Sequence, residues 1–117
     1  MDIEAFREYC LAKKGVTEGL PFGPDVLVFK VLGKMFALLN LDGLPACANL
    51  KADPEEIPEL REQWPDVILP GYHMNKQHWN TVLIERLPEI VVRQLTDQSY
   101  QLVYNALPKK IRSEFEA

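Results

Sequence analysis

Hydrophobic residues recur at helical spacing in three segments of the chain. Asp2 suits the N-cap of the first segment, and Pro88 suits the first position of the last. The middle helix begins either at Pro54 or near Ile57, because Pro58 would remove a backbone donor from its first turns. The expected helices cover residues 2–14, 54–64 and 88–107, and the last of them is followed by a short basic tail or a last short helix.

Runs of β-branched, aromatic and leucine residues lie between these helices. Leu32-Gly33 and Asp42-Gly43 are short connections of the kind that join antiparallel strands. The expected strands cover residues 26–31, 34–39, 46–51, 67–69 and 78–84. The order α-β-β-β-α-β-β-α predicts an α+β domain: an antiparallel sheet with helices packed on one face and the other face open to a partner.

The length of 117 residues fits a single domain, residues 1–117, with one continuous core. No apolar run approaches the about 20 residues that cross a bilayer, and the charged, helix-patterned N-terminus does not resemble a signal peptide. Cys10 and Cys47 form no CxxC pair and are expected to pack as small buried hydrophobic residues. We therefore expect a cytoplasmic protein in a reducing compartment.

The net charge of −4 weakens the case for a protein that coats nucleic acid, because phosphate neutralisation supplies most non-specific affinity. The negative charge is concentrated, however. Residues 53–66 contain six acidic side chains against one arginine, so the rest of the chain is close to neutral. An acidic face can therefore coexist with a neutral or mildly basic one.

The segment 70–82 is the richest in candidate functional side chains. It holds both histidines and a tryptophan but no acidic residue, which is more than a chain reversal requires. Rings at 72, 73 and 79 could stack on bases, amides at 75, 77 and 80 could reach base edges, and Lys76 could contact a phosphate. The alternative is structural: Trp79 packs in the core while Asn75 and Asn80 tie the loop backbone through local hydrogen bonds.

Catalysis and metal binding find little support. His73 and His78 are five residues apart, at neither helical nor strand spacing, and no acidic residue or cysteine lies between them. Cys47 is flanked by alanines, without a glycine-rich turn to activate it. No phosphate-binding GxxxxGK or GxGxxG loop is present. We expect neither an enzyme nor a bound metal or cofactor.

Several segments together resemble the MmcQ/YjbR family of small bacterial proteins. The resemblance rests on residues 71–76 and 78–82, supported by 34–37, 50–54, 99–103 and 107–110, and so covers nearly the whole chain. It implies an α-β(3)-α-β(2)-α fold similar to that of type III secretion chaperones. It also implies DNA binding through a "double wing" of loops and hairpins. Gln77 stands where the family often has a basic residue, which removes one phosphate contact.

The first functional hypothesis is weak, salt-sensitive DNA binding by the 71–80 loop and the 30–34 hairpin. The candidate nucleic-acid-binding residues are Lys30, Lys34, Lys51, Tyr72, His73, Asn75, Lys76, Gln77, His78 and Asn80. The second hypothesis is a protein-interaction or chaperone-like module that uses the open sheet face or a dimer contact. Either protein would be a monomer or a weak homodimer.

Overall fold

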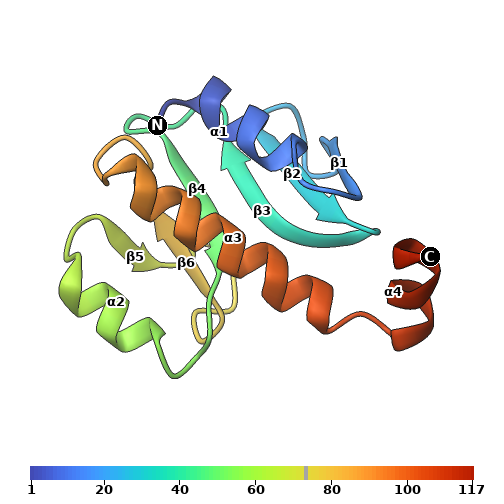
Figure 1. Cartoon of the computed structure of the whole chain (residues 1–117). Helices are drawn as coiled ribbons and strands as arrows, with labels where there is room; N and C mark the ends of the chain where they lie inside the picture. Colours follow the sequence, from blue (N-terminus) through green and yellow to red (C-terminus); the bar gives the residue numbers. More distant parts are fainter. Residues whose placement is uncertain (73) are drawn as a thin grey trace.

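The computed structural model describes residues 1–72 and 74–117. The order of its helices and strands is close to the expected one (Figure 1). The elements are α1 (Ile3–Leu11), β1 (Val16–Gly19), β2 (Val26–Val31), β3 (Lys34–Asn40), β4 (Cys47–Lys51), α2 (Ile57–Gln63), β5 (Ile68–Pro70), β6 (Trp79–Val82), α3 (Glu89–Asn105) and α4 (Lys109–Glu116).

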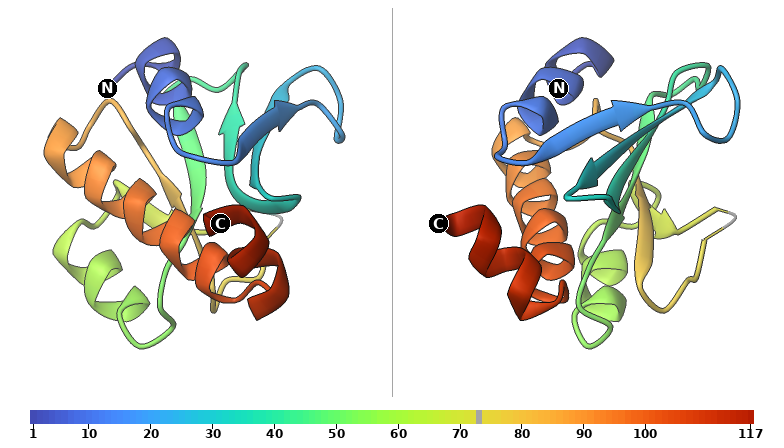
Figure 2. Two further views of the ribbon diagram at one scale, coloured as in Figure 1. Left: turned by 45° about the vertical axis from the view of Figure 1, so that its right-hand side comes forward. Right: turned by 90° about the vertical axis from the view of Figure 1, so that its right-hand side faces the viewer.

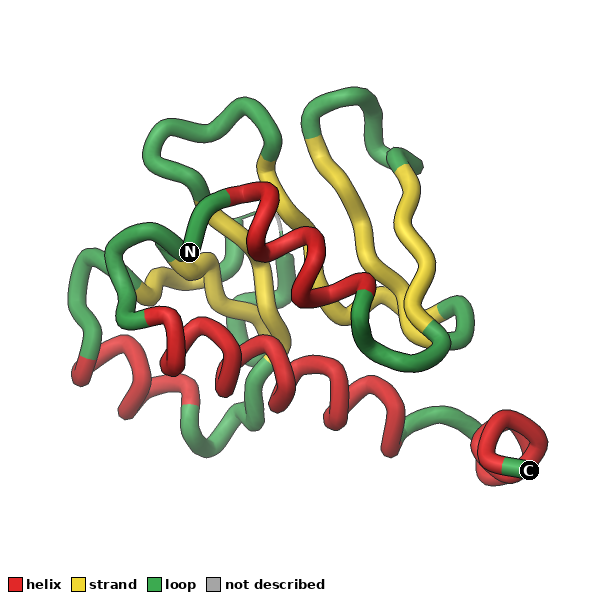
Figure 3. The backbone as a smooth tube through the Cα atoms, turned by 45° about the horizontal axis from the view of Figure 1, so that its top comes forward, coloured by secondary structure: helices red, strands yellow, loops and turns green. Residues whose placement is uncertain are grey.

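The six strands form one antiparallel sheet in the order β1-β2-β3-β4-β6-β5. The helices lie on one side of this sheet, and the right-hand view of Figure 2 shows that the opposite face carries none. Figure 3 shows α4 beyond the end of α3, at the C-terminus. The α+β class with helices packed on one face is therefore confirmed.

The hairpin between β2 and β3 follows its sequence signal. Val31 pairs with Lys34, so Leu32 and Gly33 form a two-residue turn. Both turn residues have positive φ, 48° and 87°, as a type I′ turn requires. Glycine adopts this conformation without steric cost, which explains why the chain reverses here.

Strand β1 was not predicted. Its sequence Val16-Thr17-Glu18-Gly19 contains only one hydrophobic residue and ends in glycine, so it lacks the pattern of a strand. It forms because it pairs along the edge of β2. The Arg7 guanidinium on α1 binds the carboxylate of Glu18, with Nη2 and Oε2 2.5 Å apart, and this contact lowers the pKa of Glu18.

The helix starts were predicted more accurately than the ends. The Asp2 carboxylate accepts a hydrogen bond from the amide of Ala5 at 2.8 Å, which confirms the N-cap, but α1 ends at Leu11 rather than near residue 14. Helix α2 begins at Ile57, the later of the two expected positions. The residues before it form a turn in which Asp53 Oδ1 accepts from the amide of Glu55.

The main core lies between the sheet and the helices, and a smaller apolar cluster lies on the open face. The largest fully buried side chains of the main core include Phe6, Phe29, Phe36, Leu39, Ile84 and Val92. The open-face cluster consists of Val28, Leu38 and Trp79. In the described part of the chain, no helix is long and apolar enough to span a membrane.

The hydroxyl of Ser99 fastens α3 to two strands. It donates to the carbonyl of Phe36 at 2.5 Å and accepts from the amide of Lys51 at 2.8 Å. Ser99 is fully buried, so these bonds form away from competing water. They join α3 to the beginning of β3 and to the last residue of β4.

Candidate functional site

Strand register brings three of the candidate lysines to one end of the sheet. Lys30 lies opposite Met35, the residue after Lys34. Lys51 is the last residue of β4, which runs antiparallel to β3, so it lies near the beginning of β3. Lys34 and Lys51 line the same pocket, of about 300 Å³, together with the connection between α3 and α4. Lys34 and Lys51 are far apart in the sequence, so the sequence alone did not show that they lie close together.

Lys76 joins these residues from the loop before β6. It lies three residues before Trp79, which pairs with Lys51 across β4 and β6. We call Lys30, Lys34, Lys51 and Lys76 the lysine end of the sheet. The ion pairs among the described residues are Arg7–Glu18, Lys13–Asp97 and Arg93–Glu89. None of these three pairs involves the lysine end.

Arg61 of α2 forms hydrogen bonds with the 71–80 loop. Its Nε donates to Oδ1 of Asn80 at 2.9 Å, and its Nη2 donates to the carbonyl of Lys76 at 2.6 Å. Asn80 is only 3% exposed and lies within the fold, so it does not belong to a binding surface. This burial corrects its assignment as a base contact, and its amide oxygen binds the Arg61 side chain rather than the loop backbone that the structural alternative expected. Sequence reasoning missed Arg61 because no local motif marks it.

Asn75 also has a structural role. Its Oδ1 accepts from the amide of Gln77 at 2.9 Å, and its carbonyl accepts from the amides of His78 and Trp79. Its side chain is exposed, yet this turn already uses the amide oxygen that could have accepted from a base.

The remaining candidates differ in accessibility. Tyr72 is 71% exposed, Lys76 and Gln77 are exposed, and His78 is half-buried. His73 lies outside the described residues. Trp79 is 9% exposed and packs in the open-face cluster, as the structural alternative expected.

Gly71 allows the loop to lie against β6. Its amide donates to the carbonyl of Trp79 at 3.0 Å, and a Cβ placed on it would stand 2.9 Å from both Cβ and the carbonyl oxygen of Trp79. We expect Gly71→Ala to lower the free energy of unfolding by about 1–2 kcal/mol, because backbone must shift to relieve the contact. Urea denaturation would measure the change.

Gly19 provides the matched control. A Cβ there meets nothing within 4 Å, so Gly19→Ala is expected to change stability by less than about 0.5 kcal/mol. Equal stabilities of the two variants would show that the loop does not depend on this close approach.

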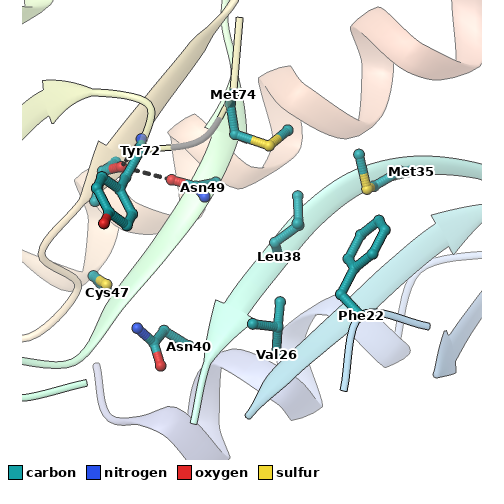
Figure 4. A pocket seen from close by; sticks show the side chains of 10 residues that line it. Phe22, Val26, Met35, Leu38, Asn40, Cys47, Asn49, Tyr72 and Met74 are labelled. Atoms are coloured by element: carbon teal, nitrogen blue, oxygen red, sulfur yellow. Dashed lines mark hydrogen bonds between the residues drawn. The ribbon is translucent and has the colours of Figure 1, made fainter. Parts of the chain in front are cut away.

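The structure reveals an apolar pocket of about 400 Å³ on the open face, which the sequence did not indicate (Figure 4). It lies between the β1–β2 loop, which carries Phe22, and the β5–β6 loop, which carries Tyr72 and Met74. Its other lining residues are Val26, Met35, Leu38, Asn40, Cys47, Asn49 and Thr81.

The two cysteines occupy different environments. Cys10 is fully buried, as expected, and burial raises its pKa to about 12. Cys47 was also expected in the core but is half-buried on the pocket wall, because it belongs to the outward row of β4. Burial raises the pKa of the Cys47 thiol as well, so the pocket holds no activated thiolate.

The acidic helix α2 lies on the helix-bearing side of the sheet. Its Leu60 and Trp64 pack against the main core, which α1 and α3 also contact. Glu59 and Glu62, two of the six acidic residues of the segment 53–66, are therefore kept off the open face. Outside residue 73, no three His, Cys, Asp or Glu side chains converge to hold a metal ion.

A family model described as YjbR matches residues 11–102. The chain belongs to the YjbR family. It is 44% identical to the uncharacterized protein YbdF of Escherichia coli O157:H7 over 92 residues, covering 77% of this chain and 74% of that one. It is 36% identical to the uncharacterized protein YjbR of Escherichia coli K12 over 114 residues, covering 96% of this chain and 95% of that one.

Crystal structures of related proteins share the fold of this YjbR-family chain. The Deinococcus radiodurans protein DR2400, of family-model domain DUF419, superposes with a TM-score of 0.90 at 38% identity. That superposition covers 97% of this chain and 87% of the other. A Pseudomonas syringae protein gives a TM-score of 0.76 at 31% identity, covering 88% of this chain and 99% of the other. Family membership therefore establishes the fold but not the function, which has to be inferred from the geometry of the site.

Proposed function

We propose that this YjbR-family protein binds DNA through the lysine end of its sheet. The observation that supports the proposal is that strand register places Lys30, Lys34 and Lys51 at the end of the sheet where the loop with Lys76 leads into β6, with none of the four in an ion pair of the described residues. Lysine side chains contact phosphates as point charges and carry no sequence information. The proposed role is therefore binding rather than catalysis, without marked sequence preference, in the cytoplasm.

The number of charges sets the expected strength of binding. Four phosphate contacts on a duplex correspond to a slope of about −3.6 in log K against log salt concentration. The overall charge of −4 opposes association at long range. Binding should therefore be detectable at low salt and fall steeply as salt rises.

Lys76→Ala tests the proposal directly. It is expected to weaken binding to all duplex sequences alike and to reduce the magnitude of the salt slope by about one unit, because one phosphate contact is lost. Fluorescence anisotropy with two unrelated duplexes across a salt titration would measure both quantities.

Arg86→Ala is the matched control for this charge change. Arg86 is exposed and lies beyond the end of β6, opposite the lysine end, so its loss should leave the salt slope unchanged. If the two variants gave the same slope, Lys76 would make no phosphate contact and the proposal would fail.

A protein partner on the open face is the second candidate function. Phe22 of the β1–β2 loop is 65% exposed and Tyr72 of the facing loop is 71% exposed, and both line the open-face pocket. Exposed apolar side chains gathered around a pocket are typical of interaction sites. This candidate uses the pocket, whereas the DNA proposal uses the lysine end.

A further inference from the structure

The pocket on the open face adjoins the lysine end. Met35 lines this pocket and also the smaller one that contains Lys34 and Lys51. Met74, on the opposite wall, lies two residues before Lys76. A nucleic-acid strand whose phosphates lie on these lysines would therefore have its neighbouring bases beside the pocket.

The walls of the pocket suit a flat ring. Phe22 and Tyr72 come from loops at opposite edges of the sheet, and Figure 4 shows both rings at the pocket with Leu38 and Val26 between them. Bases stack on exposed aromatic side chains in proteins that bind single strands. Thioethers such as those of Met35 and Met74 are polarizable and adapt to the edges of aromatic groups.

A short chain of hydrogen bonds fixes one polar group in the pocket. The amide of Tyr72 donates to Oγ1 of Thr81 at 3.1 Å, and this hydroxyl donates to Oδ1 of Asn49 at 2.6 Å. The amide of Asn49 is thereby oriented, and its Nδ2 remains on the pocket wall as a donor without an acceptor among the described residues.

This donor distinguishes between occupants. A purely aliphatic group, such as an acyl chain or a leucine side chain, would cover Nδ2 of Asn49 and leave its hydrogen unpaired, at a cost in affinity. Pyrimidines and guanine present an exocyclic carbonyl oxygen that can accept this hydrogen while the ring packs against Phe22 or Tyr72. The adjoining lysines supply the charge that a phosphodiester strand requires.

We infer that the open-face pocket receives an unpaired nucleobase and that the protein prefers single-stranded DNA to duplex. The inference rests on the proposed function, because the same lysines hold the backbone in both cases. A base inside a duplex is stacked and paired and cannot enter the pocket without the cost of extrusion. The pocket thus accounts for the preference for single-stranded DNA, whereas the lysine end binds the phosphates of single strand and duplex alike.

The test compares a short labelled oligothymidylate with a duplex of the same length by fluorescence anisotropy at low salt. The single strand is expected to bind the parent protein more tightly. Phe22→Ala is expected to weaken single-strand binding by about 5-fold to 150-fold, the range for loss of one base stack, and to leave duplex binding unchanged. Phe22 is 65% exposed in a loop, so this variant should retain its fold.

Two controls separate stacking from other effects. Leu44→Ala removes an equally apolar side chain, 98% exposed, that does not line the pocket, and should change neither affinity. An oligonucleotide with abasic sites keeps the phosphates but lacks bases, so it should lose the advantage over duplex in the unmodified protein.

Each contrary result has a distinct meaning. Equal affinity for single strand and duplex, or full binding of the abasic strand, would overturn the nucleobase inference while leaving the DNA proposal intact. Absence of any DNA binding at low salt would overturn both. Binding of an apolar peptide that Phe22→Ala weakens, with oligonucleotide binding unaffected, would assign the pocket to a protein partner instead.

Discussion

Replacement of Arg61 by alanine is expected to lower the free energy of unfolding by about 2–3 kcal/mol. The side chain donates to Asn80 Oδ1, to the carbonyl of Lys76 and, at 3.4 Å, to the carbonyl of Trp79. Asn80 is 3% exposed, so its amide oxygen would lose its charged donor in a site that water reaches poorly. Urea denaturation would measure the loss of stability.

The same variant should also release the loop that carries Lys76. Backbone amide resonances of residues 75–79 are expected to shift in two-dimensional NMR spectra, because two of the three bonds end on carbonyls of this loop. Arg61→Lys keeps the charge but lacks the planar fork of donors, so it should recover only part of the stability. Arg86→Ala is the control for the removal of one arginine from the surface.

A stability of Arg61→Ala within about 0.5 kcal/mol of the parent would contradict this account. The result would mean that the loop is held by its own turn, through Asn75, rather than by α2. In that case the lysine end would be independent of the acidic helix.

Replacement of Ser99 by alanine is expected to cost about 2–3 kcal/mol. The hydroxyl is fully buried and links the carbonyl of Phe36 to the amide of Lys51. Alanine adds no bulk but leaves both backbone groups without this partner. The amide of Lys51 should then exchange with deuterium faster than in the parent protein, which NMR would detect at a single resonance.

Ser113→Ala is the matched control, because Ser113 is exposed on α4. It removes the same hydroxyl from a helix without breaking a buried bond. If Ser99→Ala left both the stability and the exchange rate of the Lys51 amide unchanged, α3 would be held on the sheet by apolar packing alone.

Local signals in the sequence predicted the parts of the fold that local chemistry determines. Asp2 caps its helix through its own carboxylate, and Gly33 completes a turn that needs positive φ. Strand β1 escaped prediction because its formation depends on pairing with β2 rather than on its own residues. The start of α2 was predicted as one of two positions, and Pro58 correctly indicated the later one.

The candidate site was harder to predict, because it is assembled from distant segments. The 71–80 loop stood out by composition, yet the role of Asn80 depends on Arg61, 19 residues earlier. The lysines were found one by one, whereas their convergence follows from strand register and from where β4 ends. The pocket was missed since Phe22 lies in a turn-rich segment that gives no sign of facing another loop.

The alternation along β4 separates two kinds of residue within a single strand. Ala48 and Leu50 belong to the main core, whereas Cys47 and Asn49 line the pocket and Lys51 belongs to the lysine end. Every second position can therefore change without disturbing the packing of the helices. The residues that line the pocket can vary between members of such a family while their architecture stays the same, and a protein engineer can alter them by the same substitutions.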